Sequence, residues 1–258
     1  MGYHPNPGKT WLIVKNENKM EKAKEIFSGT GVKITSFGKK HLGAVLGSVS
    51  SKQQFVKQKV DEWVNHLKSL SLFAKTDPHE AYAAFTYGFI HKWKYVQRTV
   101  PDIADLFQPI EDVIRSELIP ALVGRAVSDT ERLICSLPTK LGGLNIPNPT
   151  KLCSKEYEWS EKLTLSLTEN VIKQNLFEED SPEEIKERHD QILKEIKDEK
   201  KSIQKEMHDS IFASLDDERK RSLNLASEKG ASIWLNTLPI KSMGYALNKQ
   251  EFLDAIAL

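Results

Sequence analysis

The first fifty residues contain short apolar runs that predict strands. Residues 10–15 enclose a Trp-Leu-Ile-Val run, which is rich in β-branched side chains and follows a segment of prolines and glycines. Two further extended segments, 31–35 and 41–47, are separated by Phe37-Gly38-Lys39-Lys40, and we expect them to pair as a hairpin. Residues 17–27 lie between the first strand and this hairpin, where we expect one helical crossover.

After Ser50 the spacing of apolar residues changes from two to about 3.6, which predicts helices. Three stripes follow, each on one helical face and joined by short connections, as in a small helical bundle. The stripes are Val56, Val60, Trp63, Val64, Leu67 and Leu70; Tyr82, Phe85, Phe89, Trp93, Val96 and Val100; and Ile103, Leu106, Phe107, Ile110, Val113 and Ile114.

Capping signals divide the next part of the chain. Ser128-x-x-Glu131 is typical of a capping box, and we expect the short helix that it opens to end before Pro138. Residues 142–149 are rich in Gly, Pro and Asn, which indicates either a domain boundary or a structured turn. A further helix is expected over about residues 150–175.

A long charged helix is predicted near the C-terminal end. Ser181-Pro182-Glu183-Glu184 combines an N-cap, a first-turn proline and a capping-box glutamate, and the helix should reach about Phe212. Asn248-x-x-Glu251 predicts one more helix. A thin apolar stripe on the long helix favours packing along one side or a short coiled coil. That stripe is Ile185, Ile192, Ile196, Ile203, Met207 and Ile211.

These patterns predict an α+β fold that is predominantly α-helical. We expect three parts: residues 1–49 with the strands, residues 50–149 with the helical bundle and its following loop, and residues 150–258 as a helical extension. The extension contains the long charged helix, at about residues 182–212.

Composition favours a soluble protein without a membrane partner. No apolar run approaches the ~20 residues of a membrane helix, and the opening residues lack an apolar stretch behind a basic flank. The two cysteines, Cys135 and Cys153, form no CxxC pair and lie near no closely spaced histidines, so neither a disulfide framework nor a zinc site is expected. A reducing compartment, cytoplasmic or nuclear, fits these features.

The charges are unevenly distributed along the chain. Residues 1–100 contain 16 Lys and Arg against 7 Asp and Glu, whereas the remainder contains 21 against 29. The net charge of +1 thus hides a first part at +9 and a second part at −8. Either a basic surface for phosphates or chance segregation on solvated faces explains this asymmetry.

The segment 91–98 interleaves cations with aromatic residues, as surfaces that grip phosphates and stack bases do. Trp93 continues the second apolar stripe and is expected in the core. Lys92, Lys94 and Arg98 must then point elsewhere, as exposed candidates for phosphate contacts without a carboxylate nearby in the sequence.

Other candidate motifs predict no catalytic or metal site. Gly8-Lys9-Thr10 ends like a phosphate loop, but Tyr3 stands where the first glycine is required and a strand follows instead of a helix. His41 is isolated, as surface or structural histidines are. His189 and His208 are too far apart to share a metal. Asp216-Asp217 is typical of a helix start with acidic first-turn residues.

Several segments, taken in order, resemble motifs of retroelement reverse transcriptases. Residues 2–10 with the following strand are similar to motif D, and residues 41–47 are similar to motif E, the primer-grip hairpin. Residues 50–125 look like a helical thumb. Two phrases resemble regions downstream of the thumb in LINE-like elements, Leu-Pro-x-x-x-Gly-Gly-Leu at 137–144 and Gly-Ala-Ser-x-Trp-Leu-x-x-Leu-Pro at 230–239. Together they cover nearly the whole chain, which then begins with a palm remnant.

The resemblance implies binding roles without catalysis. The aspartates of motifs A and C, which hold Mg²⁺ in the complete polymerases, would lie before Met1, so no catalytic residue and no cofactor is expected in this chain. The implied roles place Lys9 near the phosphates of the incoming nucleotide and His41, Leu42 and Gly43 along the primer terminus. The thumb would face the duplex backbone.

The leading interpretation is a fragment of a retroelement RNA-directed DNA polymerase that contacts a primer-template weakly and does not polymerise alone. The alternatives are a helical protein-interaction module around the helix from Ser181, with helix-mediated self-association, and an incomplete gene model of a full polymerase. A palm cut before its central hairpin would leave the strand at residues 11–14 with an unpaired edge, which promotes aggregation.

Overall fold

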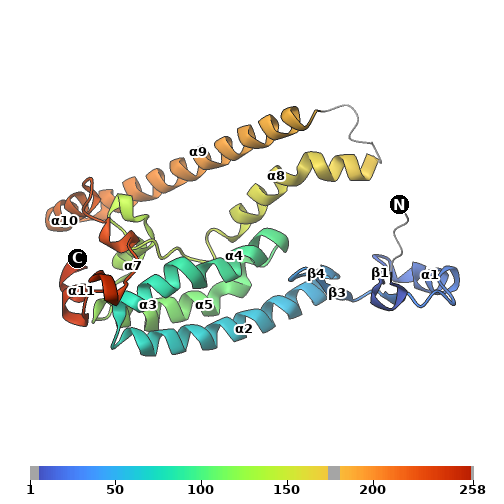
Figure 1. The fold of residues 1–258 in the computed structure, drawn as a ribbon, viewed down its shortest axis with the longest axis horizontal. Helices are drawn as coiled ribbons and strands as arrows, with labels where there is room; N and C mark the ends of the chain where they lie inside the picture. Colours follow the sequence, from blue (N-terminus) through green and yellow to red (C-terminus); the bar gives the residue numbers. More distant parts are fainter. Residues whose placement is uncertain (1–5, 174–180, 257–258) are drawn as a thin grey trace.

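The computed structural model describes residues 6–173 and 181–256. Within these residues the chain forms an elongated α+β molecule that is predominantly helical (Figure 1). Two small sheets lie towards the end of the molecule at which the chain begins, and helices form the rest of the described fold. The predicted fold class is confirmed.

The first sheet is parallel. Strand β1 (Trp11–Ile13) pairs with β2 (Lys33–Thr35), with Leu12 opposite Ile34, and helix α1 (Met20–Ile26) lies in the connection between them. The predicted crossover is therefore confirmed. The expected pairing of residues 31–35 with residues 41–47 is wrong, because residues 33–35 pair with β1 and residues 44–47 pair with residues 38–41.

One strand of the hairpin is built mainly from residues that were expected to form its turn, and the other lies within the expected strand at residues 41–47. Strand β3 (Gly38–His41) pairs with β4 (Ala44–Gly47) in antiparallel register, and Leu42 and Gly43 form a two-residue turn with φ of 46° and 85°. Positive φ at both turn positions matches the twist of the flanking strands. The strands approach closely at Gly47, where a Cβ atom would lie 2.3 Å from the Cα atom of Gly38.

The predicted helical bundle is confirmed, with two π-helical turns inside it. Because a π-helical turn inserts one residue into an α-helix, each turn shifts the apolar stripe relative to a regular helix. The bundle consists of α2 (Val49–Ala74), α3 (Pro78–Ala84), the π-helical turn Phe85–Phe89, α4 (Ile90–Thr99), α5 (Gln108–Val113), the π-helical turn Ile114–Leu118 and α6 (Ile119–Val123).

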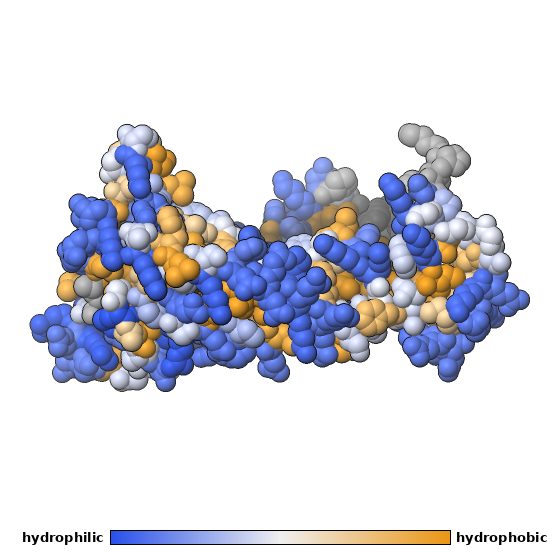
Figure 2. Space-filling model, turned by 90° about the horizontal axis from the view of Figure 1, so that it is seen from below, coloured by the Kyte–Doolittle hydropathy of each residue, from blue (hydrophilic) through white to orange (hydrophobic). Residues whose placement is uncertain are grey.

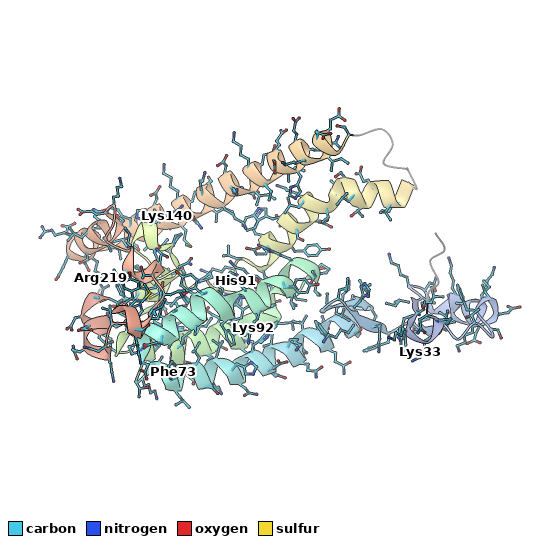
Figure 3. The ribbon with its side chains drawn as sticks, viewed as in Figure 1. Lys33, Phe73, His91, Lys92, Lys140 and Arg219 are labelled. Carbon is cyan, nitrogen blue, oxygen red and sulfur yellow. The ribbon has the colours of Figure 1, made fainter. Side chains whose placement is uncertain are left out.

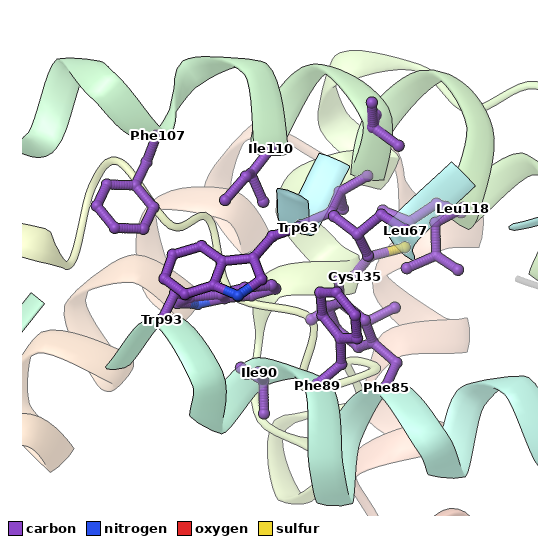
Figure 4. Close-up of a cluster of buried hydrophobic side chains, with 14 of the residues drawn as sticks. Trp63, Leu67, Phe85, Phe89, Ile90, Trp93, Phe107, Ile110, Leu118 and Cys135 are labelled. Carbon is purple, nitrogen blue, oxygen red and sulfur yellow. The ribbon is translucent and has the colours of Figure 1, made fainter. Parts of the chain in front are cut away.

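The three apolar stripes meet in one core (Figure 4). Trp63 of α2 stacks on Phe107 with ring centres 6.4 Å apart, and Phe89 lies edge-on to Trp93 at 5.5 Å. Trp93 is 1% exposed, as its place in the stripe predicts. Val45 of the hairpin joins the same core and so attaches the hairpin to the bundle.

The loop at residues 142–149 is a structured turn packed on the bundle. It follows α7 (Asp129–Ser136), whose predicted capping box between Ser128 and Glu131 is present. Leu144 and Ile146 are buried in the main core. Side chains of three helices donate hydrogen bonds to carbonyl groups of this loop: Tyr82 to Leu144 at 2.9 Å, Arg132 to Ile146 at 2.9 Å and Gln97 to Pro149 at 2.8 Å.

The C-terminal part contains α8 (Cys153–Lys173), α9 (Pro182–Ser214), α10 (Asp217–Ser227) and α11 (Lys249–Ala255). The capping boxes at Ser181 and Asn248 are confirmed, whereas the end expected for α8 near Asn175 lies outside the described residues. Helix α9 packs along one side, against α7 and α8, with Ile196 and Ile211 buried.

Candidate nucleic-acid interface

The hairpin turn is fastened to helix α4. The Tyr95 hydroxyl donates a hydrogen bond to the carbonyl oxygen of Leu42. Gly43 packs closely against the same ring: a Cβ atom at this position would lie 3.3 Å from Tyr95 Cε1. The structure thus brings the predicted primer-grip residues and the cation-rich helix together, through a tyrosine that the sequence did not single out.

One face of the hairpin meets the first sheet. Residues that lie opposite one another in antiparallel strands share a face, so Lys39 and Leu46 lie on one side, and Lys40 and the buried Val45 lie on the other. The Lys39 ammonium is 4.4 Å from the centre of the Trp11 ring. Contacts between β1 and β3 join the two sheets at this point.

Trp11 has two lysine ammonium groups close to its ring. Lys33 of β2 places its ammonium 5.5 Å from the same ring centre, and the Trp11 side chain remains 36% exposed. A partly exposed indole flanked by cations has the features that stack a base and hold its phosphates. We use the name basic platform for Trp11 and the cations near it on both faces of the hairpin, which are Lys33, Lys39, Lys40 and His41; all five residues are exposed at the surface.

The segment that contains the platform is basic as a whole. Residues 6–47 contain eight Lys and no Arg against three Glu. One of these lysines, Lys24, pairs with Glu21 at 2.7 Å. Hydrophilic residues cover most of the molecular face seen in Figure 2, with smaller apolar patches between them. The segment that contains both sheets therefore carries five more positive than negative charges, eight against three.

Lys92 lies on the side of α4 that faces α2 (Figure 3). Its ammonium is 4.8 Å from the centre of the Phe89 ring, which His66 of α2 contacts edge-on at 6.3 Å. The pKa of the Glu62 carboxyl is lowered, first by its hydrogen bond from Lys59 and to a lesser degree by Lys92. Lys92 is exposed as expected, but it shares its surroundings with a carboxylate from α2.

Lys94 and Arg98 lie on the opposite side of α4, towards α8. Arg98 Nε donates to Glu156 Oε2 at 2.8 Å, and that carboxylate is buried. Lys94 is half-buried, and burial lowers its pKa. Arg98 is exposed as expected, but it is paired with a carboxylate 58 residues along the chain, whereas Lys94 is half-buried instead of exposed. Lys92, Lys94 and Arg98 do not form one patch.

Lys9 is not brought to α4. It ends the exposed 3₁₀ turn Pro7–Lys9 that precedes β1, and that turn lies beyond the hairpin at the end of the molecule (Figure 1). Residues 2–5 of the motif D resemblance lie outside the described residues. Lys9 thus lies in a turn that contacts β2, apart from the helical cations.

The adjacent aspartates Asp216 and Asp217, considered as a possible metal site, lie at the start of α10. Asp216 accepts a hydrogen bond from the Arg219 backbone at 2.8 Å as the N-cap of α10, as its sequence context predicts. In residues 6–173 and 181–256 no group of three or more His, Cys, Asp or Glu side chains is arranged to hold a metal ion. No described helix has the length and apolar character needed to span a bilayer.

Sequence reasoning missed Trp11 as a surface residue and Tyr95 as a contact. Both lie in segments that it identified, but Trp11 was part of an apolar strand pattern and Tyr95 part of a charged run. Comparison with known proteins adds no further guide, since no protein-family model, no curated protein and no solved structure matches this chain.

Proposed function

We propose that the basic platform binds the sugar-phosphate backbone of a nucleic acid, as the non-polymerising part of a reverse transcriptase would hold a primer-template. The observation that carries this proposal is the exposed Trp11 ring with the ammonium groups of Lys33 and Lys39 close to it, on a sheet joined to a hairpin that Tyr95 links to the bundle. Cations that contact phosphates increase the affinity for a nucleic acid by releasing counterions. An exposed aromatic ring increases it further by stacking on a base.

Binding of a fluorescent RNA–DNA primer-template should weaken as salt is raised. Each phosphate contact contributes about 0.9 to the slope of log K against log salt for a duplex. We expect the variant Lys33→Gln/Lys39→Gln/Lys40→Gln to lower that slope by about two to three and to weaken binding at every sequence tested. Fluorescence anisotropy over a salt series measures both quantities.

The matched control is Lys186→Gln/Lys205→Gln/Lys229→Gln, which removes the same charge from exposed positions on α9 and beyond α10. It should leave the slope unchanged. Equal effects of the two triple variants would show that net charge alone drives binding, and undetectable binding of the unaltered chain would refute the proposal. Trp11→Leu separately tests stacking, which is worth about 1–3 kcal/mol per base.

A second candidate function is self-association through the far end of α8. Four apolar side chains there are exposed by 45–74% although they lie on a long helix packed against α9. They are Leu165, Leu167, Val171 and Ile172. Sedimentation of the full chain should show a dimer that Leu165→Ser/Ile172→Ser converts to a monomer. A monomeric unaltered chain would exclude this function.

A further inference from the structure

A pocket lies between α4, α7, α8 and α9, on the side of the bundle away from Lys92. It has about 180 Å³ of free space and is partly open to solvent. Its walls are mostly apolar and come from all four helices and the adjoining loops, chiefly through Ile90, Leu133, Pro138, Leu152, Ile203 and Met207. A dry cavity of about 150 Å³ is sufficient to hold a benzene ring.

The charged side chains around this pocket are mainly cations. Lys94, Arg132, Lys151 and Lys200 line it, against the single carboxylate of Glu156. Arg132 is neutralised by Glu111, and Glu156 is held by Arg98. The charges of Glu111 and Arg98, which do not line the pocket, cancel one another. The net charge of the lining, four cations and one carboxylate, therefore stays at +3.

Lys94 is a lining cation without a direct partner, although the Glu156 carboxylate, which Arg98 and Lys200 already contact, attracts its charge. It is half-buried, and within residues 6–173 and 181–256 its ammonium makes neither a hydrogen bond nor an ion pair. An ammonium that is removed from water without a partner is costly, and an anion beside it would offset that cost. Lys151 is exposed at the rim and forms no ion pair with any residue that the structure describes.

Lys200 is held in place on the other wall. Its ammonium lies 4.2 Å from the centre of the Trp159 ring and 3.5 Å from Glu156 Oε1. The Trp159 indole N–H in turn donates to Glu199 Oε2 at 2.9 Å. This fixed ammonium requires no further ordering when a ligand arrives, which lowers the entropic cost of binding.

We infer that this pocket binds a small amphipathic anion, with an apolar body about the size of one aromatic ring among the α7 and α9 side chains and a carboxylate or phosphate group beside Lys94 and Lys200. We infer the anionic group from the excess of positive charge in the lining. We infer the ring from the apolar walls and the free volume. This inference does not depend on nucleic-acid binding, because the basic platform lies on other elements.

Phenyl phosphate is a suitable probe, followed by ¹H–¹⁵N NMR of the five tryptophan indole signals, with Trp159→Phe used to assign the relevant one. Phenyl phosphate should shift the Trp159 signal, and benzoate should do the same if either anionic group suffices. Benzyl alcohol, which lacks the charge, and inorganic phosphate, which lacks the ring, should each bind at least about tenfold more weakly.

Lys94→Met keeps the apolar stem and removes the charge, so it should weaken phenyl phosphate binding about tenfold or more. Lys92→Met is the matched control on the other side of α4 and should leave the affinity unchanged. Equal binding of phenyl phosphate and inorganic phosphate, an unshifted Trp159 signal, or equal effects of the two lysine variants would overturn the inference.

Discussion

The Glu131 carboxylate is held in its ionised form by two donors. It accepts a hydrogen bond from the Arg125 guanidinium at 2.8 Å and one from the Ser128 backbone N–H at 2.7 Å, as part of the capping box of α7. These contacts, the Arg125 bond first, lower the pKa of Glu131 to about 2 from its usual 4.5. The folded state therefore binds its proton only at strongly acidic pH.

This residue should make folding stability depend on pH below about 4.5. Because the pKa of Glu131 is lower in the folded than in the unfolded chain, its contribution is complete above pH 4.5 and is lost as the pH falls towards about 2. Urea unfolding at pH 6 and pH 3 should show a larger loss of stability for the unaltered chain than for Glu131→Gln. An equal loss would refute this account.

At the residue scale, the sequence indicated which side chains are buried but not which partners the charged ones find. The period of the second stripe was enough to place Trp93 in the core. Nothing in the run around Arg98 indicated Glu156, because the two residues meet only after α4 and α8 have packed. Tyr95 and Leu42 lie 53 residues apart in the sequence, and they meet only after the hairpin has packed on α4.

At the element scale, a buried ion pair links α5 to α7. The Arg132 guanidinium binds both oxygens of Glu111, at 2.8 Å and 2.7 Å, and both side chains are less than 9% exposed. Arg132 also donates to the carbonyl of Ile146. We expect Arg132→Met alone to reduce the free energy of unfolding by about 3–5 kcal/mol, because it leaves the Glu111 carboxylate buried without a partner.

The double variant Glu111→Leu/Arg132→Met should regain most of that stability, since it removes both charges and leaves mainly the lost Ile146 bond. Chemical unfolding of the single and double variants measures the difference. Lys24→Met, which breaks an exposed pair with Glu21, serves as the control and should cost less than about 1 kcal/mol. A double variant as unstable as the single one would contradict the prediction.

The sequence predicted helices better than strand pairing. Capping boxes and apolar periods are local signals, and they located α2, α7 and the start of α9 correctly. The hairpin turn contains Leu42 at positive φ, a conformation that leucine seldom adopts. The sequence therefore did not indicate where the turn lies. The glycine and lysines at residues 38–40 resembled a turn but form the strand itself.

At the scale of the whole molecule, one core joins parts that are far apart in the sequence. Val45 of the hairpin, the helices of the bundle and Phe252 and Ile256 of the C-terminal end belong to the same buried cluster. Phe252 is fully buried and packs against His79 and Tyr82, with ring centres 5.4 Å and 6.1 Å away. The described C-terminal helix α11 therefore supports the bundle from outside.

Phe252→Ala should destabilise the bundle as a whole, by about 3–5 kcal/mol, because a large cavity would open beside α3. Hydrogen exchange should show weaker protection throughout α2 and α4, which are distant in sequence. Leu238→Ala, at a side chain that is 52% exposed, is the control and should change stability by no more than about 0.5 kcal/mol. Loss of protection confined to α11 would argue against a shared core.

The irregular stretch at residues 142–149 would usually be chosen as the place to open a polypeptide, because it is rich in glycine and proline. Its carbonyl groups, however, are where side chains from α3, α4 and α7 converge. Circular permutation or an inserted tag at this point would break hydrogen bonds from three helices at once. Anyone engineering new ends into the chain should keep this stretch intact.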